Sequence, residues 1–291
     1  MKSLYDVSAP AKLNLFLHVT GRRADGYHLL QSVFALIDWS DTLHMDVRPD
    51  GIITRQDLNQ TLPSDDLITK SARALQQATG CSLGVHIGIE KNVPAQAGMG
   101  GGSSDAASTL LALNRLWRLN LPIESLIAIG LKLGADIPFF LGGRNALVEG
   151  IGDKITPLDL PTVGYVVVKP GAGLDTHMIF SDPDLKRDTE PATIEGLLEN
   201  VFGDNVTYGQ NDLQAVAQKL CPGISQALKW LESIGLNGRM TGSGSAVFAR
   251  VPDAMNRLED LFCQESKLQI RVCRGLEAHP MLGWANSDGR N

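Results

Sequence analysis

A glycine-rich stretch in the first half of the chain has the composition of an anion-binding loop. Four of the five residues from Gly98 to Gly102 are glycine, and Ser103 and Ser104 follow directly. Glycine lacks Cβ, so the backbone can take positive φ and several N–H groups can face one ligand. The two serine hydroxyls add groups that can bind phosphate oxygens or Mg²⁺. The stretch therefore indicates a polyphosphate site. A tight turn that needs glycine for packing alone is the alternative.

The segments on either side of this loop are typical of a strand and a helix. Apolar residues alternate over residues 85–89 and recur at steps of three and four over residues 106–117. A helix that begins here adds unpaired N–H groups and the positive end of its dipole to the anion site. We expect Ser103, Ser104 or Asp105 to cap this helix.

Two common phosphate-binding loops are excluded. A Walker A loop requires a lysine directly after its last glycine, and none follows here. The Rossmann fingerprint G-x-G-x-x-G requires a third spacing that the glycines at 98, 100 and 101 do not provide. The loop must belong to another class.

Two charged residues outside the loop are candidates for chemistry. Lys12 shares one face of a predicted strand with Asn14, while apolar residues from Leu13 to Val19 form the other face. Asp136 lies between a predicted helix and a short apolar segment. Taken alone, Lys12 is also consistent with a solvated surface lysine and Asp136 with a helix N-cap.

The composition is that of an ordinary globular protein. The chain has 291 residues, enough for two packed domains, with 43% hydrophobic and 20% charged residues. A net charge of −6 gives no general attraction to nucleic acid or to an anionic membrane. The four cysteines form no C-x-x-C pair, and the N-terminus lacks the apolar core of a signal peptide. We therefore expect a cytoplasmic protein that binds neither nucleic acid nor membrane.

The remaining pattern predicts alternating strands and helices. Asp50-Gly51 is a hairpin signal after the second strand, and the tail after Gly275 is expected to be weakly ordered. A second glycine-rich turn spans residues 238–245. The expected strands cover residues 8–19, 30–38, 43–47, 146–149, 165–168, 246–251 and 269–274; helices cover 64–79, 122–133, 176–180, 211–220, 224–234 and 252–264; and 150–159 and 181–190 are a crossing between domains and a surface loop.

Three separated motifs together resemble the GHMP kinase superfamily of small-molecule kinases. They are residues 10–14, residues 94–104 and residues 240–244, in that order. Residues 23–28 and 133–138 narrow the resemblance to the members that act on a cytidine diphosphate ester of methylerythritol. Ala95-Gln96-Ala97 and Asp105 depart from the pattern, since many members carry more glycine at the former and asparagine at the latter. Neither departure removes a backbone donor to phosphate.

The resemblance implies an α+β fold with mixed α/β character in two domains. Residues 1–156 would form an N-terminal α/β domain that binds ATP and contains a left-handed β-α-β unit. Residues 157–291 would form a C-terminal ferredoxin-like domain, with the active site between the two. It also implies that the protein acts as a monomer or weak homodimer, with ATP and Mg²⁺ as cofactors; the protein ligands of the metal are left unassigned.

The resemblance assigns roles to individual residues. Asp136 would accept the proton of the substrate hydroxyl, and Lys12 would keep Asp136 ionised and polarise that hydroxyl. The loop that binds ATP would comprise Pro94, Ala95, Gln96, Ala97, Gly98, Met99, Gly100, Gly101, Gly102, Ser103 and Ser104. The small-molecule substrate would bind Asn14, Tyr27, His28, Thr176 and Phe180.

Within that substrate site, Tyr27 and Phe180 would stack on the cytosine and His28 would read its edge through main-chain atoms. Core packing is the alternative for both rings. Asp66 and Lys91 are candidates on the adenine side.

Two other functions stay open: a superfamily kinase for mevalonate, homoserine or a sugar, and a ligand-sensing relative without catalysis. The aromatic pair argues against the first, and the presence of Lys12 and Asp136 argues against the second.

Overall fold

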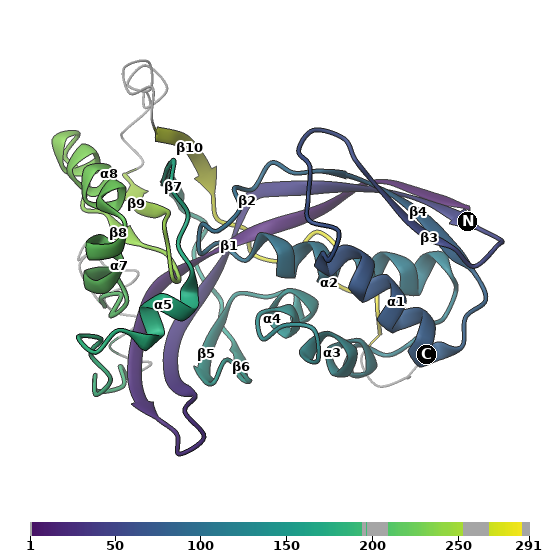
Figure 1. The fold of residues 1–291 in the computed structure, drawn as a ribbon, viewed down its shortest axis with the longest axis horizontal. Coiled ribbons are helices and arrows are strands. Elements are labelled where there is room, and N and C mark those ends of the chain that lie inside the picture. Colours follow the sequence, from purple (N-terminus) through teal and green to yellow (C-terminus); the bar gives the residue numbers. More distant parts are fainter. Residues whose placement is uncertain (1, 194–195, 197–208, 253–267, 287–291) are drawn as a thin grey trace.

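The computed structural model describes residues 2–193, 196, 209–252 and 268–286, and Figure 1 shows their arrangement. Strands and helices alternate as expected for an α+β fold. The elements are β1 (Ser3–Arg22), β2 (His28–Arg48), β3 (Ile53–Asp57), α1 (Leu67–Thr79), β4 (Gly84–Glu90), α2 (Gly101–Leu116), α3 (Ile123–Leu131), α4 (Ile137–Gly142), β5 (Ala146–Gly150), β6 (Lys154–Pro157), β7 (Gly164–Pro170), α5 (Thr176–Ser181), α7 (Gln214–Leu220), α8 (Pro222–Ser233), β8 (Arg239–Met240), β9 (Val247–Val251) and β10 (Leu268–Arg274).

The first sheet has the order β3-β4-β2-β5-β6, with β1 paired to β2. All its pairs are antiparallel except β3 and β4, which flank α1 in a parallel β-α-β unit. Helices α1 to α4 lie on one side of this sheet (Figure 1). Fully buried Leu43, Ile87 and Leu110, from β2, β4 and α2, belong to one core between sheet and helices. This core fixes α2, and with it the glycine loop, against the strands.

The expected hairpin at Asp50-Gly51 is wrong. The chain does turn there, but β3 pairs with β4, and β4 occupies the place beside β2. The apolar residues Val85, Ile87 and Ile89 of β4 are fully buried, so this strand takes the central position and leaves the more polar β3 at the edge.

Two further expectations about the strands are corrected. The two segments expected at 30–38 and 43–47 form one strand, β2, and both β1 and β2 extend well beyond their expected bounds. Residues 150–159 are not only a crossing, because β6 lies within them and pairs with β5. The division of the chain at residues 156 and 157 stays a prediction.

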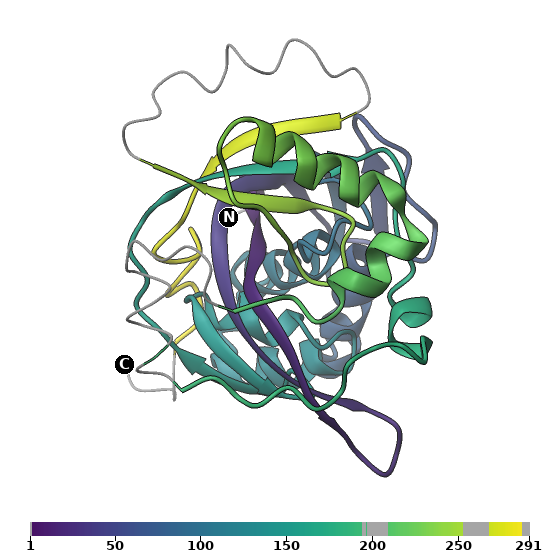
Figure 2. The same cartoon turned by 90° about the vertical axis from the view of Figure 1, so that its left-hand side faces the viewer.

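The second sheet has the order β10-β7-β9-β8, and all its pairs are antiparallel. In chain order this is the sequence fourth, first, third, second, which fits the expected ferredoxin-like domain. Helices α7 and α8 lie on its outer side (Figure 2), where Ile224 and Leu231 of α8 pack with Val166 of β7. The helix expected at 252–264 lies outside the described residues, apart from its first position.

Within the segment after Gly275, the described residues 276–286 are packed rather than weakly ordered. His279 and Met281 are buried, and Met281 belongs to the core of the first sheet. The N–H of Leu276 donates to the carbonyl of Leu36 at 2.8 Å. The segment therefore returns from the second sheet to the first half of the molecule. None of the helices in the described ranges is long and apolar enough to cross a membrane.

Candidate active site

A cavity of about 630 Å³ lies between the two halves of the molecule. Its walls come from β1, the glycine loop, the start of α4, α5 and the second glycine-rich turn. Residues far apart in the chain thus face one space. Cavities of this size are typical of small-molecule sites.

The glycine loop approaches this cavity with left-handed backbone at Gly98 (φ 71°) and Gly100 (φ 69°). Gly101 has no positive φ and is already the first residue of α2. The N-cap is Gly100, and no side chain caps the helix, so the expected capping by Ser103, Ser104 or Asp105 is wrong. The first N–H groups of α2 have no partner within the helix.

The two serines after the glycines differ. Ser103 lines the cavity. Ser104 is fully buried, its N–H donates to Gly100 at 2.9 Å and its hydroxyl donates to the carbonyl of Pro10 at 2.6 Å. The Ser104 hydroxyl therefore holds α2 against β1 and is not placed to bind phosphate. The other predicted loop residues, 94–102, all line the cavity.

The second glycine-rich turn supports the first one. A Cβ on Gly98 would come within 2.1 Å of the carbonyl oxygen of Thr241, and one on Gly242 within 2.6 Å of the oxygen of Gly98. The N–H of Ser245 also donates to the carbonyl of Gln96 at 3.2 Å. The two turns thus pack backbone against backbone, which requires glycine on both sides.

Lys12 is buried in this site, with 4% of its surface exposed, so the reading of a solvated lysine is wrong. Its Nζ lies 3.9 Å from Oδ2 of Asp136 and 4.4 Å from the centre of the Phe34 ring, and it donates to Oδ1 of Asn14. Burial lowers the pKa of Lys12, and the carboxylate of Asp136 opposes this shift. Lys12 therefore depends on its neighbours to keep its proton.

Asp136 stands at the N-cap position of α4 but makes no capping hydrogen bond. The simple N-cap reading is therefore wrong. Its side chain is 36% exposed and faces the cavity beside Lys12. A free, partly exposed carboxylate next to a buried cation is suited to accept a proton.

Asn14 connects Lys12 to both halves of the molecule. Its Nδ2 donates to the Ser32 hydroxyl at 2.9 Å, and its backbone N–H donates to the Thr241 hydroxyl at 2.9 Å. Because its Oδ1 accepts from Lys12, every polar group of the side chain has a partner. Asn14 thus fixes the position of the lysine.

The residues predicted for the acceptor substrate are only partly brought together. Thr176 and Phe180, both on α5, line the cavity. The His28 ring packs on Phe180, with centroids 4.9 Å apart, and neither His28 nor Tyr27 lines the cavity. Tyr27 is 62% exposed, so core packing is wrong for this residue.

The two candidates for the adenine side have structural partners. Asp66 caps α1, accepting from the N–H of Thr69 at 3.0 Å, and forms an ion pair with Arg55. Lys91 pairs with Asp41, and with Asp105 at 2.6 Å. Both line the cavity, so they shape that end of it, with side chains already engaged.

The cluster of Lys91, Asp41 and Asp105 was missed from the sequence. It lies buried beneath the start of the glycine loop, where Oδ1 of Asp41 accepts from the N–H groups of Asn92 and Val93 at 2.6 and 2.8 Å. Burial and the nearby Asp41 raise the pKa of Asp105. The departure from the family pattern at Asp105 was visible, but its two partners were not.

The fold and this site are those of a GHMP kinase. The family model described as "GHMP kinases N terminal domain" matches residues 66–144, and the one described as "GHMP kinases C terminal" matches residues 194–263. A mevalonate kinase structure from Methanococcus jannaschii has a TM-score of 0.68 over 94% of this chain and 98% of its own, at 15% identity. That likeness concerns the fold alone.

Closer relatives define the family more narrowly. A 4-diphosphocytidyl-2-C-methyl-D-erythritol kinase of Albidiferax ferrireducens is 65% identical over 99% of this chain and 98% of its own length. One of Acidovorax sp. (strain JS42) is 61% identical over 98% and 99%. A crystal structure of a 4-(cytidine 5'-diphospho)-2C-methyl-D-erythritol kinase has a TM-score of 0.79 and 34% identity, covering 94% of this chain and 99% of that one. The chain belongs to the family of 4-diphosphocytidyl-2-C-methyl-D-erythritol kinases.

Proposed function

We propose that the protein transfers the γ-phosphoryl group of ATP to the 2-hydroxyl of 4-diphosphocytidyl-2-C-methyl-D-erythritol, a step of the non-mevalonate route to isoprenoid precursors. The observation that carries the proposal is the pair of Lys12 and Asp136, 3.9 Å apart, in the same cavity as the glycine loop. The cavity continues from this pair to Phe180, where the cytosine end of the acceptor would bind.

The glycine loop and the start of α2 would hold the phosphates of ATP. The first N–H groups of α2 and the positive end of its dipole favour an anion at this point. Left-handed backbone at Gly98 and Gly100, which glycine permits, shapes the loop that leads into α2. Phosphoryl transfer requires mainly such positioning and neutralisation of charge.

Asp136 would take the proton from the attacking hydroxyl. Lys12 would hold the carboxylate in its ionised form and draw the hydroxyl oxygen toward the phosphate. Asn14 keeps the ammonium group of Lys12 in place through its amide oxygen. General base assistance of this kind contributes roughly 10²- to 10⁴-fold in rate.

Mg²⁺ is proposed as the metal cofactor, bound mainly by phosphate. Within the described ranges no group of three or more His, Cys, Asp or Glu side chains could hold a metal ion. Mg²⁺ in kinase sites keeps water and phosphate oxygens and needs only one or two protein ligands. The hydroxyl of Ser103, which lines the cavity at the start of α2, fits that role. The ion would supply neutralisation of the phosphate charge.

Two expectations from the sequence have no structural test and stay predictions. They are the cytoplasmic location and the monomeric or weakly dimeric state. The stacking of Tyr27 on the cytosine is also a proposal, and its exposed ring would have to meet a ligand that extends beyond the cavity.

The proposal is tested by measuring ADP release with each candidate acceptor. The cytidine diphosphate derivative should support turnover, whereas mevalonate, homoserine and galactose should not. Turnover with one of the other alcohols instead would assign the protein to another activity of the superfamily. Binding of ATP and the cytidine derivative without ADP release would favour the ligand-sensing alternative.

Phe180→Ala tests the cytosine end of the acceptor site. Stacking on an aromatic ring is worth roughly 1–3 kcal/mol per base, so the KM for the acceptor should rise by about 5- to 150-fold. The KM for ATP should not change. An equal rise in both constants would instead show that the ring acts through the packing of α5, and thermal melting of the variant serves as the control for stability.

A further inference from the structure

Arg187 makes a set of hydrogen bonds that links residues 180–185 to His28, the first residue of β2. Its Nε donates to Nε2 of His28 at 3.1 Å. Its Nη2 donates to the carbonyl of Phe180 at 3.1 Å and to that of Asp182 at 2.7 Å, and its Nη1 donates to the carbonyl of Leu185 at 2.9 Å. All three nitrogen atoms of the guanidinium group therefore donate at least one hydrogen bond. Residues 182–190 form the irregular, mostly exposed loop that was expected, and Arg187 holds this loop in place.

The bond to His28 fixes the chemical form of that ring. A guanidinium group has only donors and does not lose its proton, so Nε2 of His28 must be the acceptor. In the neutral imidazole the proton then has to be on Nδ1. Burial, with Arg187 and Arg22 nearby, lowers the pKa of His28. The ring is therefore held neutral, with one N–H donor on a defined atom.

The bonds to the carbonyls fix the end of α5. A helix of six residues leaves its last carbonyls without partners inside the helix, and a guanidinium at that end can satisfy them. The residue whose carbonyl is bound, Phe180, is the one whose ring lines the cavity. The same guanidinium thus holds both rings of the His28–Phe180 pair, which lie 4.9 Å apart at an angle of 32°.

We propose that Arg187 is a positioning residue for the cytosine end of the acceptor: it orients the Phe180 ring, which lines the cavity, and sets the tautomer of His28, whose ring packs on Phe180 without lining the cavity. The inference rests on the proposed function for its substrate. Arg187 itself does not line the cavity and acts through these two residues.

The tautomer is tested without substrate, by ¹⁵N NMR of the histidine side chains of the full-length protein. His28 is assigned with His28→Gln. In the wild type the proton should be on Nδ1. In Arg187→Met, which keeps a long apolar side chain and removes the donors, that preference should be lost. A wild-type ring protonated on Nε2, or an unchanged spectrum in Arg187→Met, overturns the proposal. The wild-type measurement does not depend on Arg187→Met, so poor folding of that variant leaves it decisive.

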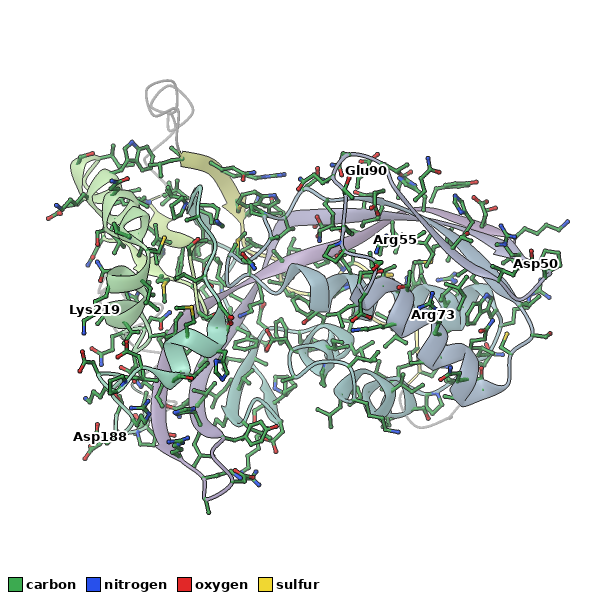
Figure 3. All side chains as sticks on the ribbon, viewed as in Figure 1. Asp50, Arg55, Arg73, Glu90, Asp188 and Lys219 are labelled. Atoms are coloured by element: carbon green, nitrogen blue, oxygen red, sulfur yellow. The ribbon has the colours of Figure 1, made fainter. Side chains whose placement is uncertain are left out.

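The positioning role is tested by steady-state kinetics. Arg187→Met should raise the KM for the cytidine derivative by about 10- to 100-fold, the cost of a displaced binding group, with the KM for ATP within about twofold of wild type. Arg187→Lys, which can replace one of the four bonds but not the fork, should lie between the two. The matched control is Asp188→Asn, at the neighbouring residue, which Figure 3 shows on the outer surface. It should behave as wild type.

Equal changes in both Michaelis constants, or none in that of the acceptor, would reduce Arg187 to a structural role. Failure of the proposed function has a different signature, because the wild type itself would then show no turnover of the cytidine derivative. In that case the NMR result still decides whether Arg187 sets the form of His28.

Discussion

Lys12 and Asp136 differ most in their exposure to solvent. Lys12 is almost completely buried, whereas the side chain of Asp136 is 36% exposed. A buried ammonium group is costly unless it has partners, and here Asn14, Asp136 and the Phe34 ring surround it. The lysine is thus preorganised, while the carboxylate remains accessible to a substrate hydroxyl.

Asp136→Asn is predicted to bind ATP nearly normally and to lose most of its turnover. The amide keeps the shape of the side chain but cannot accept the proton, so kcat should fall by roughly 10²- to 10⁴-fold. Single-turnover kinetics and ATP titration measure the two properties separately. A variant with wild-type turnover would remove Asp136 from the proposed role.

The pKa of Lys12 predicts an alkaline limb in the pH profile. Burial lowers this pKa from the ordinary 10.5, so the proton, and with it the positive charge, is lost at a lower pH than in an exposed lysine. Turnover should accordingly decline on the alkaline side before ordinary lysines titrate. In Lys12→Arg, whose residual activity should be low, that decline should be absent because arginine does not titrate in this range. If turnover of the wild type and of Lys12→Arg declined at the same alkaline pH, a group other than Lys12 would cause the decline.

Single residues could be predicted from the sequence where a motif contained them, and not where the partners are remote. Lys12 and Asp136 were found in this way. The cluster of Lys91, Asp41 and Asp105 was not, because its members are brought together by the pairing of β2 with β4 and by the packing of α2. Likewise, the role of Ser104 depends on the carbonyl of Pro10, which lies 94 positions away in the chain.

At the scale of elements, the two glycine-rich turns act as one unit. Their backbones are close enough that side chains on Gly98 or Gly242 would meet the opposite turn. The type of each element was predicted from its local pattern, as for α1, whose expected end at Gly80 is a left-handed C-cap. The contact between the two glycine-rich turns was not predicted, because the spacing of glycines in one turn carries no information on which segment packs against it.

Gly98→Ala is predicted to raise the Kd for an ATP analogue by about 5- to 150-fold, from roughly 1–3 kcal/mol of backbone strain and displacement of the loop. The residue has φ 71°, and its new Cβ would lie 2.1 Å from the oxygen of Thr241. Gly142→Ala, in α4, is the control: φ is not positive there, and a Cβ would meet nothing within 4 Å. Isothermal titration with an ATP analogue measures the effect. Equal affinities in both variants would mean that docking of the two turns does not shape the phosphate site.

At the scale of the molecule, two long-range segments join the halves. The hairpin of β1 and β2 starts in the first core and reaches the second, where Leu17 and Val19 pack with residues of β7 and α7. The segment after Gly275 runs in the opposite direction and buries Met281 in the first core. The apolar residues of the tail follow neither a helix nor a strand period, so its pattern did not predict this packing. The packing depends on a surface that exists only after the first half has folded.

His279 in this returning segment predicts how stability depends on pH. Its ring is buried, which lowers the pKa to about 4 from the ordinary 6.5, and its Nδ1 accepts from the N–H of Met281 at 3.1 Å. Well above pH 6.5 the ring is neutral in both the folded and the unfolded chain, so it does not change the free energy of unfolding. Below pH 6.5 the histidine takes up a proton in the unfolded chain but stays neutral in the folded chain, so the free energy of unfolding falls as the pH decreases toward 4. Between pH 6.5 and 5 the loss amounts to about 2 kcal/mol.

His279→Gln should remove this component, because glutamine does not titrate and its amide oxygen can still accept from Met281. Urea unfolding at pH 7 and at pH 5 measures it: the free energy of unfolding should fall by about 2 kcal/mol less in the variant than in the wild type. His177→Gln, at an exposed position on α5, is the control and should lose as much as the wild type. If His279→Gln loses as much stability as the wild type, the tail does not exclude the proton, and its packing on the first half is looser than the burial of His279 implies.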